Sequence, residues 1–356
     1  MKKFKNIITY VIITLLCISV LVGYIKKNID SKSTPTLANG AVSVGSEADK
    51  KTHIEEVMKK SVAKPNPNPT VGIGRGEDYG KVTSEAINNA GGLKDIIKKG
   101  DVVIIKPNIC AQAEAGGPII TDYRAVQEVV NEVTALGAGK VIIAEGSIMG
   151  DAFDKDNTKL NKYDTIKGAE LVNLNKFEKE ECYELKADKS LTEKAIFIPK
   201  IYMDADKVIT VAKLKTHFQP DAVVSLSLKN SFGAPPGAVY GLGGKDGLHN
   251  LGLKEAILDI NKIRKPDFAI IEGIVGGEGF GPMANTPVKS NIMLAGRDLV
   301  ALDTVALNFM GFTLDQVPHV KLAGEQKMGI SDLSKITVKG ADLNSIKMNF
   351  ESTFKR

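Results

Sequence analysis

The sequence predicts an α/β fold with a mainly parallel, doubly wound sheet, preceded by an N-terminal transmembrane helix and a linker. From Thr70 onward, short continuous apolar runs alternate with segments that are apolar at every third or fourth residue. Such runs are typical of strands covered on both faces, and such spacing is typical of amphipathic helices. Their alternation favours parallel strands joined by helical crossovers. Before Thr70, a long uncharged apolar run is followed by a polar, proline-rich stretch.

The N-terminal run is long enough to span a membrane. Three lysines lie within the first five residues, and residues 7–25 then carry no charge before Lys26 and Lys27. At ~1.5 Å per residue this run spans about 28 Å, close to the thickness of the hydrocarbon core. Bulky Leu16 precedes Cys17, where a lipoprotein cleavage site needs a small residue. Residues 1–27 are therefore predicted to be an uncleaved, single-pass signal anchor in the cell membrane, with the remaining chain outside the cytoplasm.

A linker and a domain follow the anchor. Residues 28–69 are rich in Ser, Asn, Gly, Lys and Pro, and they end in alternating prolines that favour an extended backbone. Residues 70–340 are predicted to form the α/β domain, and residues 341–356 a C-terminal tail.

The strands and helices of the domain are expected in alternation. Strands are predicted at residues 101–105, 140–144, 207–211, 268–271, 292–294 and 336–338. Helices are predicted where valines recur from Val126 to Leu136, where leucine and isoleucines recur from Leu253 to Ile263, and at residues 299–310. Gly137 ends the first helix and Pro266 follows the second. Residues 157–199 are less regular and are expected to form an inserted subdomain or an antiparallel edge.

Composition excludes several classes of function. The net charge is only +5 over 47 basic and 42 acidic residues, and there is no tryptophan, so no nucleic-acid partner is expected. Cys110 and Cys182 are the only cysteines after the anchor, too few for a cysteine-bound zinc or iron–sulfur cluster. Two free buried thiols are favoured, and a disulfide between them stays open. The nucleophile-elbow, P-loop, H-E-x-x-H and calcium-loop motifs are all missing from the sequence.

Charged side chains follow four predicted strands. Lys106 and Asn108 follow the first, Glu145 the second, Lys213, Lys215 and His217 the third, and Glu272 the fourth. Carboxyl ends of parallel strands meet at one edge of the sheet, where ligands bind. These side chains are therefore expected to form one pocket, and the repeated Lys and Glu ends indicate a weak two-fold repeat.

The residue types favour a small anionic ligand. Lys106, Lys213, Lys215 and Lys229 are the predicted anion-binding groups, with Asn108 and Asn230 beside them. His217 is the predicted acid/base, aided by Glu145 or Glu272. Thr121 and Asp122 open a helix, so they either cap it or face the ligand.

Three further features are candidates for the site. A divalent metal held by His217, His249 and a carboxylate is a variant of this prediction. Asn250 fits the N-cap of a helix that starts at Leu251. Residues 276–282 hold a G-x-G-x-G pattern without dinucleotide spacing, and are expected to form a ligand-facing loop that carries Glu278. In addition, Asp303 lies inside an apolar helix and needs a buried partner, and His319 looks structural.

The chain resembles the family known as domain of unknown function 362. The matching pieces are Ile105-Lys106-Pro107-Asn108, Thr121-Asp122, Gly137-Ala138, Val141 to Gly146, Lys213-Leu214-Lys215-Thr216-His217, Leu228-Lys229-Asn230, His249-Asn250, Pro266-Asp267, Glu272-Gly273, Gly281-Pro282, and Asp298 with Leu302-Asp303. The resemblance implies no activity. Some relatives carry a ferredoxin-type cysteine cluster and some carry secretion signals; this chain lacks those cysteines, so no iron–sulfur cluster is expected.

Three functions from different classes stay open at this stage: an enzyme, a binding module and a cell-envelope scaffold. The first is an enzyme that acts on a small anionic substrate. The second is a non-catalytic anion- or metal-binding module of the cell envelope. A carboxylate or histidine with a shifted pKa in the pocket would favour the enzyme. A scaffold role would need large apolar surface patches.

Overall fold

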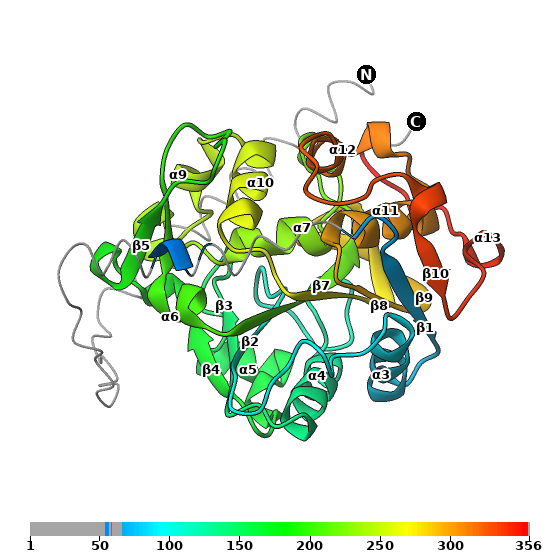
Figure 1. Cartoon of the computed structure of the whole chain (residues 1–356), viewed down its shortest axis with the longest axis horizontal. Coiled ribbons are helices and arrows are strands. Elements are labelled where there is room, and N and C mark those ends of the chain that lie inside the picture. Colours follow the sequence, from blue (N-terminus) through cyan, green and yellow to red (C-terminus); the bar gives the residue numbers. More distant parts are fainter. Residues whose placement is uncertain (1–53, 57, 59–65, 355–356) are drawn as a thin grey trace, which may run out of the picture. The chain divides into compact units, whose positions relative to one another are not determined.

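An eight-stranded sheet forms the centre of the fold, in the order β10-β1-β9-β8-β7-β2-β3-β4 (Figure 1). The computed structural model describes residues 54–56, 58 and 66–354. The predicted signal anchor and most of the predicted linker lie outside these residues. Within them, the helices are too short or too polar to cross a bilayer.

Parallel pairing dominates the large sheet. Its strands are β1 (Thr70–Arg75), β2 (Val102–Pro107), β3 (Lys140–Glu145), β4 (Glu170–Asn173), β7 (Lys207–Lys215), β8 (Phe268–Phe280), β9 (Ala284–Gly296) and β10 (Thr337–Lys339). Only β9 runs antiparallel, to β8 on one side and β1 on the other. The predicted α/β fold with a large, mainly parallel sheet is therefore confirmed.

Helices cover both faces of the sheet (Figure 1). One face carries α3 (Tyr79–Asn89), α4 (Tyr123–Ala135) and α5 (Lys155–Asn161). The other carries α7 (Leu226–Asn230), α10 (Leu253–Ile263), α11 (Leu299–Met310) and α12 (Pro318–Glu325). Along β2, Ile104 packs into one core and Val103 and Ile105 pack into the other. The central strands β2, β3 and β7 bury both of their faces, which explains their continuous apolar runs in the sequence.

The long helices have their predicted positions. The helix at Leu299–Met310 has the predicted bounds, and the helix at Leu253–Ile263 spans the predicted apolar repeat. The helix α4 begins after Asp122, whose side chain accepts a hydrogen bond from the Arg124 backbone N–H. It ends just before Gly137, which has a φ of +90° that favours glycine.

The prediction of a loop at residues 276–282 is wrong. The strand β8 continues through this stretch to Phe280, and it pairs with β9 as a long antiparallel hairpin. Its glycines permit close packing, because a Cβ atom on Gly277 would lie 2.7 Å from the carbonyl oxygen of Pro118. The glycine pattern therefore marks a crowded strand.

The N-cap prediction for Asn250 is also wrong. A short helix, α9 (Asp246–His249), ends at Asn250. The helix α10 starts only at Leu253, after Gly252 with a φ of +90°. Asn250 therefore terminates one helix and does not start the next.

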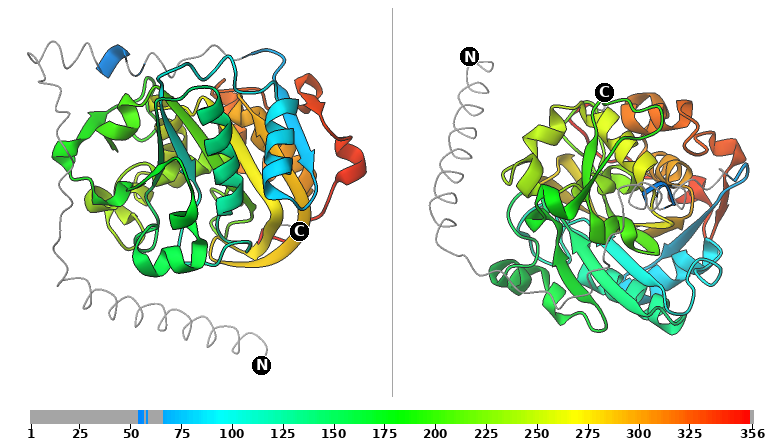
Figure 2. Two further views of the ribbon diagram at one scale, coloured as in Figure 1. Left: turned by 90° about the horizontal axis from the view of Figure 1, so that it is seen from below. Right: turned by 60° about the vertical axis from the view of Figure 1, so that its left-hand side comes forward.

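The irregular region and the tail both pack onto the domain. Within residues 157–199, β4 extends the large sheet in parallel with β3, and β5 (Cys182–Leu185) and β6 (Ile196–Pro199) form a separate antiparallel pair. Three further short helices are α6 (Lys200–Asp204), α8 (Gly237–Tyr240) and α13 (Leu343–Ile346). After α13, Phe350 is buried and Ser352 bridges to Gly279 of β8, so the C-terminal segment lies against the curved hairpin (Figure 2).

Candidate functional site

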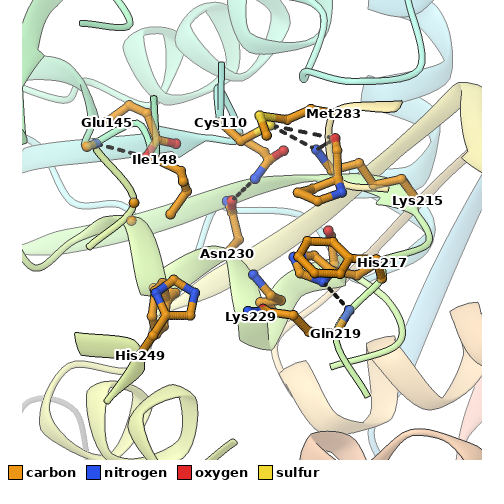
Figure 3. Close-up of a pocket in the computed structure, with 18 of the residues that line it drawn as sticks. Cys110, Glu145, Ile148, Lys215, His217, Gln219, Lys229, Asn230, His249 and Met283 are labelled. Atoms are coloured by element: carbon orange, nitrogen blue, oxygen red, sulfur yellow. Dashed lines mark hydrogen bonds between the residues drawn. The ribbon is translucent and has the colours of Figure 1, made fainter. Parts of the chain in front are cut away.

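A cavity of about 300 Å³ lies at the carboxyl ends of β2, β3 and β7 (Figure 3). Its polar lining comes from these strand ends, from the loop after β7, and from α7 and α9. The polar side chains are those of Lys106, Asn108, Cys110, Glu145, Lys215, His217, Gln219, Ser225, Lys229, Asn230 and His249, with Asp246 at the exposed rim. The structure thus brings together residues that are up to 143 positions apart, between Lys106 and His249.

A buried ion pair forms one wall of the cavity. The Nζ atom of Lys106 lies 3.0 and 2.9 Å from the two carboxylate oxygens of Glu145. Glu145 also accepts hydrogen bonds from the backbone N–H groups of Gly146, at 2.8 Å, and Ile109, at 3.3 Å. Burial lowers the pKa of Lys106, and the charge of Glu145 opposes this shift. Because its carboxylate is fully engaged, Glu145 is poorly placed to act as the predicted base.

A second Lys–Glu pair lies outside the cavity. Lys213 of β7 pairs with Glu272 of β8, and both side chains are fully buried. Glu272 also accepts backbone hydrogen bonds from Asp122 and Ile274, and burial raises its pKa. The two lysines thus repeat one arrangement on neighbouring strands, but only Lys106 reaches the cavity. Placing Lys213 and Glu272 in the pocket was therefore wrong.

An irregularity in the pairing of β7 with β8, with the extra residues on the β8 side, accompanies the different positions of Lys213 and Lys215. The pairing of β7 with β8 shifts register between these two residues, and such a shift re-aims the side chains that follow it. Lys215 lines the cavity, where its Nζ atom donates to the carbonyl oxygens of Ile119 and Pro282 and lies 3.3 Å from the Cys110 sulfur. Burial lowers the pKa of Lys215.

Three other predicted site residues have structural contacts outside the cavity. The Thr121 hydroxyl accepts from the Asn108 backbone and donates to the Val211 carbonyl. Asp122 caps α4 and forms an ion pair with Arg124 at 2.8 Å. The Glu278 carboxylate accepts from the backbone N–H of Glu351 at 2.8 Å. The structure therefore does not place Thr121, Asp122 or Glu278 where a cavity ligand would contact them.

The helix α7 is held at both ends. At its start, Asp303 accepts hydrogen bonds from the Ser227 backbone at 2.9 Å, the Ser227 hydroxyl at 2.6 Å and the Leu228 backbone at 3.0 Å. These are the partners that a buried carboxylate needs, and burial raises the pKa of Asp303 to about 7. At its end, Asn230 donates to the Lys106 carbonyl at 3.1 Å and accepts from the Asn108 amide at 3.1 Å.

Lys229 lies on this fixed helix and, unlike Lys106 and Lys215, its Nζ atom has no hydrogen-bond acceptor among the described residues. Among residues 66–354, no carboxylate lies within ion-pair distance of its Nζ atom. The Nζ atom lies 5.4 Å from the centroid of the Phe232 ring, a weak cation–π contact. Burial, with the nearby charge of Lys215, lowers the pKa of Lys229 to about 8. The cavity thus contains a cation that the described residues do not neutralise.

The two histidines of the cavity hold opposite tautomers. The Nδ1 atom of His217 accepts the backbone N–H of Gln219 at 3.1 Å, so a neutral His217 carries its proton on Nε2. The Nδ1 atom of His249 faces the carbonyl oxygen of Lys245 at 3.1 Å, so it must donate, which leaves the lone pair on Nε2. Burial lowers the pKa of both imidazoles, and the charge of Lys229 lowers them further. Both are neutral at physiological pH.

The metal-site variant lacks support in the structure. Within the described residues, no group of three or more His, Cys, Asp and Glu side chains is arranged to hold a metal ion. In the view of Figure 3, Lys229 lies between His249 and His217, and its charge would repel a cation there. Cys110 and Cys182 are both free and buried.

Lys245 is a buried residue beside the cavity that the sequence analysis missed. Its Nζ atom donates to the carbonyl oxygens of Gly146 at 2.8 Å, Gly233 at 3.1 Å and Pro235 at 2.7 Å. It joins the loop after β3 to the loop after α7, and burial lowers its pKa to about 7. Gln219 and Ser225 also line the cavity and were not predicted. Lys245 and Gln219 follow no apolar run, and Ser225 follows only the three-residue run Ala222–Val224, which is too short to predict a strand.

The fold and the cavity define an α/β protein with a cationic pocket at the carboxyl edge of its sheet. The family model described as domain of unknown function (DUF362) matches residues 103–308, and the chain belongs to this family. This confirms the resemblance seen in the sequence.

Comparison with individual proteins finds more distant similarity. A thylakoid-associated protein of Synechocystis is 29% identical over 249 residues, which cover 68% of this chain and 72% of that protein. The lactate racemase apoprotein of Thermoanaerobacterium thermosaccharolyticum superposes with a TM-score of 0.41 and 14% identity, over 59% of this chain and 52% of that one. A Thermotoga maritima protein superposes with a TM-score of 0.36 and 10% identity, over 75% and 62% of the two chains. The chain therefore spans about half the length of the racemase chain.

Proposed function

We propose that this chain is a membrane-anchored protein that binds a small anionic ligand in the cavity between α7 and the strand ends. The unpaired ammonium group of Lys229 carries the proposal. Lys229 is partly buried, and withdrawing a charge from water is costly unless an opposite charge compensates it. Lys106, at the end of β2, has the carboxylate of Glu145 as its partner. Lys229 has none within the described residues, so a bound anion would supply the missing charge.

Neighbouring groups suit the same ligand. Lys215 adds a second positive charge, whose contacts are carbonyl oxygens and a thiol. The Nε2–H of neutral His217 adds a hydrogen-bond donor, and a donor of this kind stabilises a carbonyl or oxyanion. A carboxylate or phosphate group would be matched by both the charge and the donors of this wall.

A second candidate function is catalysis on the bound anion, and the tautomer of His249 favours it. Its Nε2 lone pair is the proton acceptor in the cavity, since Nδ1 is fixed as a donor to Lys245. His217 would act as a donor, which reverses the acid/base role predicted for it. Neither Glu145, which is paired, nor Glu272, which lies elsewhere, has a role in this scheme.

The membrane location is also a proposal. The uncharged run at residues 7–25, with its flanking lysines, supports a single-pass anchor with the domain outside the cytoplasm. The name of the Synechocystis relative, which is thylakoid-associated, fits a protein at a membrane. Protease protection of the chain in sealed vesicles would test the orientation. Degradation of residues 66–354 by external protease in inside-out vesicles would contradict it.

Isothermal titration of the full chain in zwitterionic lipid nanodiscs tests anion binding. Inorganic phosphate and oxalate are the probes, and native mass spectrometry of the same sample reports any co-purified ligand. Lys229→Gln should weaken binding of the probes by about tenfold or more, since a hydrogen bond to a charged group contributes about 1.5–3 kcal/mol. Lys81→Gln, an exposed lysine on α3, is the matched control and should bind as the native chain does. A native chain that binds neither anion and carries no co-purified one would overturn the proposal.

A further inference from the structure

The mouth of the cavity has an apolar rim. Phe218 and Met283 line the cavity and are nevertheless 40% and 43% exposed. Phe280 is 49% exposed and stacks on Phe218, with ring centroids 5.4 Å apart and an interplanar angle of 18°. We call these three residues the apolar rim. Leu242, which is 63% exposed, lies in the same turn as Gly244, another cavity-lining residue.

Exposed apolar side chains are concentrated at the mouth of the cavity. Within the described residues, five large hydrophobic side chains are exposed, and the apolar rim accounts for three of them. Another, Phe354, follows Ser352, which bridges to Gly279 next to Phe280. Scattered apolar residues are ordinary on a surface, but a group at one opening marks a binding surface.

The apolar rim is built into the fold. The backbone N–H of Phe218 donates to the carbonyl oxygen of Gly281 at 2.9 Å, which ties the loop after β7 to the end of the β8–β9 hairpin. On its other side, Phe218 stacks on His217 at 5.3 Å between ring centroids. A continuous aromatic stack thus runs from the solvent-facing Phe280 to a histidine of the cavity wall (Figure 3 labels His217 and Met283).

We propose that the ligand is amphipathic, with a small anionic head in the cavity and an apolar tail along the apolar rim. This rests on the proposed anion site and names the class of ligand that it takes. Lys229 and Lys215 match the head, and the rim, which continues outward from the same cavity, matches a tail. A small hydrophilic anion would leave the aromatic stack exposed to water, whereas an alkyl chain would cover it.

Two phosphate monoesters of equal charge test this inference. Methyl phosphate and hexyl phosphate are titrated into the full chain in zwitterionic nanodiscs, with empty nanodiscs subtracted for partitioning. The native chain should bind hexyl phosphate about tenfold more tightly than methyl phosphate, since the rim covers one side of a tail whose full burial would give several-fold per methylene. The readout is the ratio of the two Kd values for each variant. Because both esters carry the same phosphate head, a change in the binding of the head affects both Kd values equally and cancels in the ratio.

Variants of the apolar rim then distinguish the outcomes. Phe218→Ser with Phe280→Ser should reduce the ratio to about one or two, whereas Phe218→Leu with Phe280→Leu keeps an apolar surface and should retain most of it. If the native chain binds both esters equally, the amphipathic ligand is overturned and the anion site stands. If it binds neither, both proposals fail. A ratio that is unchanged by the serine variants would show that the tail lies elsewhere, and that the rim serves another partner.

Discussion

Lys229 and Lys215 lie in one cavity, and the charge of Lys215, after the larger effect of burial, lowers the pKa of Lys229 to about 8. Near physiological pH Lys229 is therefore charged in most molecules, and it loses its charge as the pH rises through 8. The cavity wall also holds His217 and His249, which are neutral in this range, Lys106, which Glu145 compensates, and Cys110 and Asp246.

Anion affinity should therefore depend on pH. Sulfate keeps a constant charge in this range, so its binding isolates the protein's own titration. Because the anion favours charged Lys229, sulfate affinity should fall by up to about tenfold per unit above pH 8. Lys229→Arg carries a permanent charge and should flatten this decline. Titration calorimetry between about pH 7 and 9 measures both. An affinity for sulfate that is equally flat in the native chain would contradict the assignment of Lys229.

Asp303 is predicted to control stability through α7. Asp303→Ala removes the acceptor of three hydrogen bonds and leaves buried donors on Ser227 and Leu228 unpaired. The free energy of unfolding should fall by about 2–4 kcal/mol. Asp342→Ala removes an exposed cap of α13 and should cost about 1 kcal/mol or less. Urea unfolding of the full chain checks this, and equal losses in the two variants would be inconsistent with the buried role of Asp303.

The pKa of Asp303 has a pH signature. Its folded value of about 7 lies above its ordinary value of 3.8, so the folded chain binds the extra proton between these pH values. The contribution of Asp303 to stability is therefore largest below its unfolded pKa, and it is lost as the pH rises through about 7. Asp303→Asn should remove this dependence between pH 4 and 7. The free energy of unfolding is measured against pH for the native chain and for Asp303→Asn. If the two free energies change in parallel between pH 4 and 7, the raised pKa of Asp303 is refuted.

The Lys213–Glu272 pair is predicted to support the fold without contacting the ligand. Glu272→Ala leaves a buried, unpaired lysine and should lower the free energy of unfolding by about 3–5 kcal/mol. Replacing both partners, as Lys213→Met with Glu272→Leu, should recover most of this loss. Sulfate affinity per folded molecule should match that of the native chain in the double variant. If this double variant folds but loses sulfate binding, the Lys213–Glu272 pair belongs to the anion site.

Two glycine substitutions should change stability in opposite directions. Gly277→Ala places a Cβ atom 2.7 Å from the Pro118 carbonyl and should cost about 1–3 kcal/mol. Gly80→Ala lies in α3, where the nearest atom would be at 3.5 Å, and should stabilise by about 0.5–1 kcal/mol. Thermal unfolding of the two variants compares them directly. If Gly277→Ala leaves the thermal stability unchanged, β8 is less crowded at this position than the 2.7 Å approach of the Pro118 carbonyl indicates.

The sequence predicted the sheet well because the signal for buried strands is local. Runs such as residues 140–144 need apolar side chains on both faces, whatever lies elsewhere in the chain. The edge of the sheet could be predicted too, since parallel strands end together. This is why Lys106, Glu145 and Lys215 were brought into one site before any coordinates.

Which of the strand-end side chains point into the cavity could not be predicted in the same way. Lys213 and Lys215 are two residues apart and would share a face in a regular strand, but a register shift separates them. The carbonyl partners of Lys245 come from Gly146, Gly233 and Pro235, and no sequence pattern encodes such contacts. The glycines of β8 predict a loop because the close approach of another segment cannot be seen in a single sequence.

The most direct test is a crystal structure of the full chain grown with selenate, whose anomalous scattering locates the anion. We expect an anomalous peak inside the cavity, within hydrogen-bond distance of the Lys229 ammonium, and the loss of that peak in Lys229→Gln. Selenate bound only elsewhere on the surface, or bound identically in Lys229→Gln, would contradict it.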